Sequence, residues 1–310
     1  MAEAGRDEEP ELSVVLVTYN SAHVVTAALD GLGERRGTEV VLVDNDSTDG
    51  TADLVRDRYP HVIVVESGGN LGFAKGVNLG VRHARGSFVM LLNPDATIAE
   101  PDLRALLAAA RRDPGSVFAP FVEQPAPQRI VSAGWAPSTW RMFAHYSGLS
   151  RLGRHARWLQ GHYLLPAQVR SPVRVDWATG ACLLLSRGLW DRLGGLSERW
   201  FMYAEDVEFC WRVRSSGHDV WLLPEARATH LVGASDGRRT DSVDPAWVVN
   251  LREFHALTMA RGRASTASWT VVVAAGLASR AALAAVRHGP RSDAARRFSA
   301  YSAALVRSHR

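Results

Sequence analysis

Short runs of β-branched and aliphatic residues alternate with longer amphipathic segments in the N-terminal half of the chain, and this alternation constrains the fold more than any other feature. Four runs are nearly all apolar, as strands covered on both faces must be: Ser13–Thr18, Glu39–Val43, Val62–Glu66 and Ser87–Leu92. Helical patterns follow them at Ala22–Leu32, Thr51–Tyr59, Gly72–Ala84 and Pro101–Arg112. The alternation predicts an α/β fold with a doubly wound, mostly parallel sheet.

Polar residues follow each predicted strand, in the clusters Tyr19-Asn20-Ser21, Asp44-Asn45-Asp46-Ser47, Ser67-Gly68-Gly69-Asn70 and Asn93-Pro94-Asp95. Ligands of open α/β sheets bind at the carboxyl ends of the strands, so these clusters indicate one binding site. Asp44 can accept hydrogen bonds from a ribose hydroxyl or a nucleobase imide, whereas Asp46 and Ser47 are typical of a turn. No GxGxxG pattern follows the first strand, which argues against a dinucleotide-dependent oxidoreductase.

Asn93 and Asp95 follow the most hydrophobic predicted strand. Their side-chain oxygens suit Mg²⁺ or Mn²⁺ that bridges a diphosphate, and a plain Pro-Asp turn is the alternative interpretation. His230 follows another predicted strand, Asp219–Leu223, and could complete the metal shell. A single histidine more often serves a structural hydrogen bond, so both interpretations stay open.

Glu205 and Asp206 begin a segment with helical spacing of its apolar residues, after the aromatic-rich run 200–203. Acids at a helix N-terminus interact favourably with the helix dipole, so capping is one interpretation. Two adjacent acids after such a run are less typical of capping. A carboxylate here could act as a general base toward a hydroxyl acceptor.

The rest of the chain gives weaker signals. Residues 113–174 contain seven prolines and predict an irregular, loop-rich segment of functional importance. An apolar run at Ala181–Leu185 and a helix at Arg187–Leu193 follow. Cys182 and Cys210 fit neither a disulfide framework nor a zinc site. Because the acidic, polar first 12 residues also differ from a signal peptide, we expect a cytoplasmic protein.

Charge is distributed unevenly among the 310 residues. Residues 236–310 hold 12 arginines and five acids, whereas residues 1–235 hold 24 basic and 27 acidic side chains. The segment 268–286 is apolar but rich in alanine and interrupted by Arg280, which makes it a poor transmembrane candidate. We expect a flexible N-terminus at 1–11, a folded domain at 12–235 and a basic helical region at 236–310.

Six motifs between residues 12 and 235 together resemble the inverting glycosyltransferases of family 2, and among them the bacterial rhamnosyltransferase-like branch. They are VVLVTYNS (14–21), VLVDNDSTDGT (41–51), GGNLGFAKGVNLG (68–80), MLLNPDATI (90–98), VDWATGACLLLSR (175–187) and FMYAEDVEFCWRVRSSGHDVWLLPEARATH (201–230). No single motif would suffice, but the set stands in the family's order and spacing. The resemblance implies the GT-A fold.

The resemblance also implies a donor site and a metal site. The residues expected to hold the nucleobase and ribose are Thr18, Tyr19, Asn20 and Asp44, and the segment from Gly72 to Asn78 is expected to line the donor pocket. Asn93 and Asp95 stand at the family's DxD metal motif, with Asn in place of the first Asp. Asp95 is therefore the expected ligand for Mg²⁺ or Mn²⁺, and His230 stands where some relatives place a metal-binding histidine.

The remaining roles that the resemblance implies concern catalysis and the acceptor. Glu205 and Asp206 match the family's acidic pair, with Asp206 as the expected catalytic base. Asp176, Trp177 and Gly180 match the segment that shapes the acceptor side, and Trp177 could either stack on a sugar or pack in the core.

These implications lead to three expectations. The chain transfers a sugar with inversion, with dTDP-L-rhamnose as the favoured donor and a polyprenyl-diphosphate-linked or other cell-envelope saccharide as the acceptor. The alternatives are another UDP- or GDP-sugar donor, or a non-catalytic sugar-nucleotide-binding subunit. The basic C-terminal region either lies on the inner face of the cell membrane, packs on the catalytic domain or forms a homodimer interface, and no motif for nucleic-acid binding accompanies it.

Overall fold

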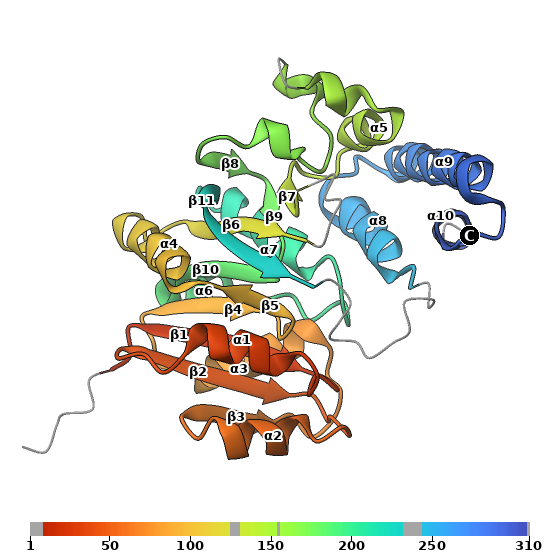
Figure 1. Cartoon of the computed structure of the whole chain (residues 1–310). Helices are drawn as coiled ribbons and strands as arrows, with labels where there is room; N and C mark the ends of the chain where they lie inside the picture. Colours follow the sequence, from red (N-terminus) through yellow and green to blue (C-terminus); the bar gives the residue numbers. More distant parts are fainter. Residues whose placement is uncertain (1–8, 125–130, 154–155, 232–243, 309–310) are drawn as a thin grey trace, which may run out of the picture.

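The nearly all-apolar strands form the middle of one mixed sheet in the computed structural model, which describes residues 9–124, 131–153, 156–231 and 244–308 (Figure 1). The elements up to residue 123 are β1 (Leu12–Thr18), α1 (Val25–Leu32), β2 (Thr38–Asp44), α2 (Thr51–Arg58), β3 (Val62–Glu66), α3 (Phe73–His83), β4 (Phe88–Leu92), β5 (Ala96–Ile98), α4 (Glu100–Arg112) and β6 (Val117–Glu123).

The remaining elements are β7 (Ala133–Gly134), α5 (Thr139–Ser147), the 3₁₀ turns η1 (Leu149–Leu152), η2 (Arg157–Leu159) and η3 (Pro166–Gln168), β8 (Val173–Val175), β9 (Trp177–Ala178), β10 (Cys182–Ser186), α6 (Arg187–Leu193), α7 (Glu205–Ser215), β11 (Val220–His230), α8 (Ala246–Thr258), α9 (Arg263–His288) and α10 (Asp293–Arg307).

The sheet has the strand order β3-β2-β1-β4-β10-β6-β11-β5, and β8 also pairs with β11. The first four strands are parallel to one another, which confirms the predicted parallel core. Strand β10 runs antiparallel to both β4 and β6, whereas β6 and β11 are again parallel. Helices α1 and α4 pack on one face of the sheet and α3 and α7 on the other, so both faces are covered.

The sequence prediction missed all of strand β6 and the second half of strand β11, because each strand contains a proline. Strand β6 lies within the segment predicted to be irregular, and β11 extends to His230, beyond the predicted end at Leu223. Proline normally argues against a strand interior because it removes a ladder hydrogen bond. Here Pro120 pairs opposite Leu223, directly before a register shift, so the lost bond falls where the ladder is already interrupted. Helix α5 is a second regular element that the prediction for this segment did not include.

The C-terminal helices α8, α9 and α10 pack against one another, and α9 also packs against α5 (Figure 1). The fully buried Trp269 donates a hydrogen bond from Nε1 to the carbonyl oxygen of Pro137, 2.7 Å away. Gly276 allows the Tyr146 ring to approach so closely that an added Cβ would lie 2.3 Å from it. Arg280 faces inward, with its guanidinium 4.6 Å from the centre of the Tyr146 ring and Nη2 2.9 Å from His145 Nε2.

By length and composition alone, helix α9 is long and apolar enough to cross a membrane, and the mean hydropathy of its most apolar 18 residues is 1.6. However, 44% of these residues are buried in the protein. The arginine that interrupts its apolar sequence is therefore explained by a contact inside the protein.

Candidate active site

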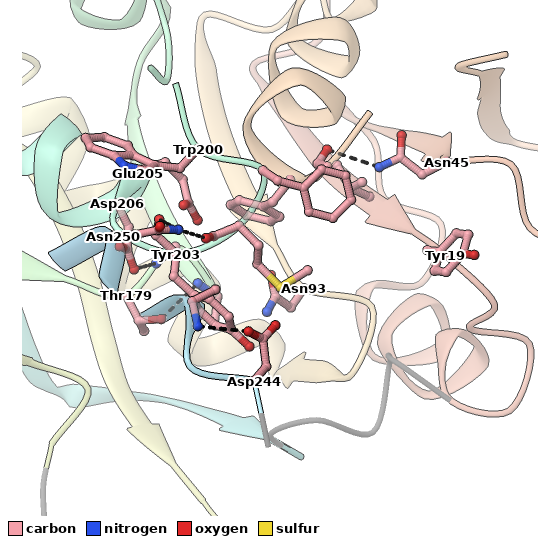
Figure 2. Close-up of a pocket in the computed structure, with 18 of the residues that line it drawn as sticks. Tyr19, Asn45, Asn93, Thr179, Trp200, Tyr203, Glu205, Asp206, Asp244 and Asn250 are labelled. Carbon is pink, nitrogen blue, oxygen red and sulfur yellow. Dashed lines mark hydrogen bonds between the residues drawn. The ribbon is translucent and has the colours of Figure 1, made fainter. Parts of the chain in front are cut away.

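A cavity of about 610 Å³ opens at the carboxyl ends of β1 and β4, which is where the polar clusters predicted a site (Figure 2). This volume lies within the range of about 300–1,000 Å³ that is typical of small-molecule sites. Its predicted members are Thr18, Tyr19, Gly72, Asn93, Asp95, Gly180, Glu205, Asp206 and His230. Thr18, Asn93 and His230 meet there because β1, β4 and β11 end at the same edge of the sheet, and α7 adds the acidic pair.

Hydrogen bonds between the ends of β1 and β2 fix one side of the cavity. The hydroxyl of Thr18 donates to Asp44 Oδ1 at 3.1 Å, and Asp44 Oδ2 accepts from the Ser47 amide at 2.9 Å. Asn20 has a positive φ of 51°, and its Oδ1 accepts from the Thr48 amide at 2.8 Å. Asp44 lies on a second, adjoining hollow of about 410 Å³, so the Thr18–Asp44 bond separates two polar recesses.

Asn45 is a cavity residue to which the sequence prediction gave no role. Its Nδ2 donates to the carbonyl oxygen of Gly72 at 3.1 Å, while its buried Oδ1 has no hydrogen-bond partner in the described part of the chain (Figure 2). Gly72 has a φ of +82°, and a Cβ there would lie only 2.3 Å from the carbonyl oxygen of Phe201. Glycine is required at this position because the cavity wall and the 201–203 loop meet there.

Asn93, Asp95 and His230 form a polar group at the end of β4. His230 Nε2 lies 3.1 Å from Asp95 Oδ1 and 3.2 Å from Asn93 Nδ2, and Asn93 Oδ1 is buried without a hydrogen-bond partner in the described residues. Ligands around an octahedral ion with bonds of about 2.1 Å are separated by about 3 Å. The oxygen and nitrogen of the Asn93 amide can be exchanged by rotating the amide. The oxygen would then face His230 Nε2 at the position that Nδ2 occupies here.

The group therefore fits a divalent ion through one carboxylate, one imidazole and one amide. No cluster of three or more His, Cys, Asp or Glu side chains occurs in the described ranges, so any ion here would take further ligands from a bound molecule. This geometry suits an ion that is shared with a diphosphate.

The acidic pair stands at the first turn of α7, after a strained turn. Tyr203 and Ala204 have positive φ angles of 68° and 76°, which are uncommon for residues other than glycine. Asp206 is partly exposed in the cavity, where Oδ2 accepts from the Gly180 amide at 3.1 Å and Oδ1 from the Val207 amide at 2.8 Å. Glu205 is only 5% exposed, and its Oε2 has no hydrogen-bond partner among the described residues.

Burial separates the chemistry of the two acids. It raises the pKa of Glu205 to about 8, with a further contribution from the negative charge of Asp206. Burial also raises the pKa of Asp206, but the amide hydrogen bonds from Gly180 and Val207 act in the opposite direction. At neutral pH Glu205 is therefore mostly a neutral acid, whereas the two amide hydrogen bonds favour the carboxylate form of Asp206.

Helix α8 completes the cavity, although the sequence prediction placed it outside the catalytic domain. Asn250 Nδ2 donates to the carbonyl oxygen of Met202 at 2.7 Å and thereby holds the strained turn before the acidic pair (Figure 2). Glu253 accepts from Trp200 Nε1 at 2.7 Å and forms an ion pair with Arg199 at 2.6 Å. Nothing in the local sequence of α8 signals these contacts, because they depend on the chain returning to the sheet.

Five predicted site residues do not line the main cavity: Asn20 and Asp44, whose contacts are given above, and Asn78, Asp176 and Trp177. Asn78 instead holds a loop, donating to the Leu196 carbonyl at 2.9 Å and accepting from the Leu196 amide at 2.9 Å. Asp176 accepts from the Ala136 amide at 2.8 Å and pairs with Arg214. Trp177 is 5% exposed and stacks on His162 with ring centres 4.8 Å apart, so it packs in the core and offers no face to a sugar.

Comparisons with known proteins identify the family and the fold of the chain. Residues 13–163 match the family described as "Glycosyl transferase family 2". The chain is 32% identical over 249 residues to the N-acetylglucosaminyl-diphospho-decaprenol L-rhamnosyltransferase of Mycobacterium tuberculosis. The aligned region covers 76% of this chain and 79% of the relative.

Two solved structures share the fold. The mannosyltransferase PcManGT from Pyrobaculum calidifontis, in complex with GDP-Man and Mn²⁺, is 19% identical, with a TM-score of 0.59 over 97% of this chain and 86% of its own. GalNAc-T7 with UDP, GalNAc and Mn²⁺ is 16% identical, with a TM-score of 0.61 over 98% of this chain and 58% of its own.

Proposed function

This chain belongs to glycosyltransferase family 2 and has the GT-A fold, and from that premise we propose that it transfers L-rhamnose from dTDP-L-rhamnose to a polyprenyl-diphosphate-linked saccharide at the inner face of the cell membrane. The observation that carries the chemistry is one cavity holding both a proton acceptor, Asp206, and a metal-compatible group at Asp95 and His230. The name of the mycobacterial relative supports the choice of donor and acceptor.

The reaction we infer is a single displacement. Asp206 accepts the proton of an acceptor hydroxyl as that oxygen bonds to the anomeric carbon, and the bond from this carbon to the diphosphate oxygen breaks. One displacement inverts the configuration. The raised pKa of Asp206 favours this role, because a general base works best when its pKa approaches the working pH. Glu205, held neutral by burial, is the less suitable base of the pair.

The opposite wall of the cavity suits the donor. Thr18 and Tyr19 lie nearest to the Asp44 recess, where a carboxylate can accept hydrogen bonds from a nucleoside. Asn93, Asp95 and His230 would hold a divalent ion, Mg²⁺ or Mn²⁺. When bound, this ion supplies positive charge that offsets the charge developing on the departing diphosphate.

The aromatic wall formed by Trp200, Phe201 and Tyr203, together with Asn250 of α8, suits the acceptor. Trp200, Tyr203 and Asn250 lie near Asp206 in Figure 2, and the tryptophan and tyrosine rings combine apolar faces with a polar N–H or O–H group, as sugar recognition requires. This assignment replaces the expected contribution of Asp176 and Trp177 on the acceptor side.

Thermal unfolding with a panel of nucleotide sugars tests the donor. A specific donor at 100 times its dissociation constant stabilises the protein by about 2.7 kcal/mol. We expect dTDP-L-rhamnose with Mg²⁺ to stabilise it and UDP-GlcNAc and GDP-mannose not to do so. Stabilisation by a UDP- or GDP-sugar but not by dTDP-L-rhamnose would overturn the donor while leaving glycosyl transfer intact.

Turnover with a polyprenyl-diphosphate-linked N-acetylglucosamine tests the chemistry. Asp206→Asn should keep donor binding but lower kcat by about 10²–10⁴-fold, the usual contribution of a general base. Asp191→Asn, which removes an exposed carboxylate on α6, is the matched control and should retain full turnover. Donor binding without any transfer by the unmodified protein would instead favour a non-catalytic sugar-nucleotide-binding subunit.

A further inference from the structure

Two segments that lie together in the upper part of Figure 1 carry the excess positive charge of the molecule. The described residues between 124 and 175 include five arginines and no acidic residue, and those between 245 and 308 include nine arginines and two acidic residues. The other described residues hold 16 basic and 25 acidic side chains. The protein therefore has a strongly positive half and a negative half, and the positive half favours anionic partners.

Four exposed apolar side chains cluster on the positive half. We call Trp140, Phe143, Leu152 and Trp158 the aromatic patch; they are 43%, 43%, 61% and 61% exposed. The Trp140 ring stacks on Trp158, with centres 5.9 Å apart, and lies 5.7 Å from the Phe143 ring. Leu152 belongs to η1, which packs against α5 and η2. Large exposed apolar side chains in a cluster indicate an interaction surface.

The aromatic patch is held rigid by hydrogen bonds, and the indole N–H of Trp140 already has an acceptor. Trp140 Nε1 donates to the carbonyl oxygen of Trp158 at 2.7 Å, and the guanidinium of Arg141 donates to the carbonyl oxygens of Arg157 and Gln160 at 2.5 Å and 2.7 Å. The Trp140 indole consequently offers its ring face and edge rather than an unpaired donor. The two indoles stack on each other, which leaves no slot between them for a nucleic-acid base.

The arginines beside the aromatic patch are exposed and not neutralised. Arg151 in η1 and Arg157 in η2 are exposed and have no carboxylate within ion-pair distance in the described residues. Unpaired like charges repel one another, so a second copy of the same surface would be a poor partner. An anionic surface would stabilise the arrangement.

We propose that the aromatic patch docks the protein on an anionic lipid bilayer, with the tryptophan and phenylalanine rings at the headgroup level and Arg151 and Arg157 on lipid phosphates. Tryptophan rings favour the membrane–water interface, and arginines near an anionic leaflet each strengthen binding. Helix α9 then acts as the packed support of α5, with its inward Arg280 committed to His145 and Tyr146. The inference rests on charge and exposure and is independent of the donor and acceptor.

Co-sedimentation of the full chain with vesicles tests the proposal. We expect binding to phosphatidylcholine vesicles that contain phosphatidylglycerol, little binding to phosphatidylcholine alone, and release at 1 M NaCl because salt screens the attraction. Arg151→Gln with Arg157→Gln should weaken binding about 25-fold, since each arginine contributes about a factor of five. Trp140→Ser with Trp158→Ser should weaken it at least tenfold.

Matched controls separate docking from general charge and from catalysis. Arg104→Gln on α4 and Ile63→Ser on β3 remove an exposed cation and an exposed apolar side chain from the negative half and should bind vesicles normally. Transfer to a short, water-soluble acceptor analogue should be unchanged in the patch variants, which distinguishes this proposal from the proposed function.

Other outcomes would overturn the proposal. Equal vesicle binding by the tryptophan variant and the unmodified protein would do so. So would a change of molecular mass in light scattering without a change in vesicle binding, which would indicate a self-association surface. Loss of RNA binding in the arginine variant with unchanged vesicle binding would indicate a nucleic-acid partner.

Discussion

Replacing Glu205 by glutamine should stabilise the protein at alkaline pH, because this residue is a carboxyl group that the fold keeps neutral. Its side chain is 5% exposed with Oε2 lacking a partner in the described residues, and burial beside Asp206 raises its pKa from 4.5 to about 8. Between these two values the native state holds a proton that the unfolded chain has released. The free energy of unfolding must therefore fall as the pH rises through this window.

The magnitude follows from the width of the window. Each pKa unit corresponds to about 1.4 kcal/mol, so the Glu205 contribution costs about 3 kcal/mol at pH 7 and at most about 5 kcal/mol above pH 8. Glutamine has the shape of the neutral acid and no proton to lose. We expect Glu205→Gln to match the unmodified protein near pH 4.5 and to exceed its stability by several kcal/mol at pH 8.5.

Urea unfolding from pH 5 to 8.5 measures this difference directly. Glu225→Gln, which removes the same charge from an exposed position on β11, is the control. A difference between Glu205→Gln and the unmodified protein that stays constant across the pH range would refute the neutral-acid argument. Retained turnover in Glu205→Gln, in contrast to Asp206→Asn, would in addition support the division of roles within the pair.

Three further predictions follow from the cavity. His230→Gln should weaken Mn²⁺ binding at least tenfold in titration calorimetry, since one of three protein ligands is exchanged, and unchanged affinity would remove His230 from the ion site. Asn250→Ala should lower kcat about tenfold at unchanged donor affinity, because the turn at Tyr203 loses the hydrogen bond that holds it, and an unchanged kcat would contradict this positioning role. Gly72→Ala should destabilise the protein by at least about 2 kcal/mol in urea unfolding, because the added Cβ would overlap the carbonyl oxygen of Phe201 and the φ angle is positive. Unfolding of the variant at the same urea concentration as the unmodified protein would contradict this close approach.

The sequence allowed the parallel part of the sheet and the edge that holds the cavity to be predicted. Buried parallel strands leave continuous apolar runs, and their polar ends must gather at one edge, so Thr18, Asn93 and Asp95 could be placed together without any three-dimensional information. The sequence also placed the acidic pair at the start of a helix, but only the resemblance to a family identified Asp206 as the expected base of the pair. The strained turn that precedes the pair has no signature in local sequence.

The residues that could not be predicted act through contacts between segments far apart in the sequence. Asn78 matches a motif, but its amide forms hydrogen bonds with the 196–198 loop. Trp177 also matches a motif, but its ring stacks on His162. In both cases a polar or aromatic residue beside the site satisfies a packing need first. A motif identifies which residues stand near a site, whereas hydrogen-bond partners decide which of them face it.

Helix α8 connects the two halves of the molecule and so connects the two proposals. It packs against α9 and α10 on the positive side, while its Asn250 and Glu253 hold the 199–203 loop at the cavity. A bilayer bound through the aromatic patch would fix the orientation of α5. The contacts of Trp269 and Tyr146 would in turn fix α9, and the packing of α9 on α8 would fix α8. Because each contact is buried and hydrogen-bonded or closely packed, docking would orient the acceptor wall relative to the lipid surface without requiring that the cavity change shape. Vesicles should therefore lower the KM for a membrane-embedded acceptor while leaving kcat for a soluble acceptor unchanged, and an increase of kcat with the soluble acceptor would show that docking instead activates the acidic pair.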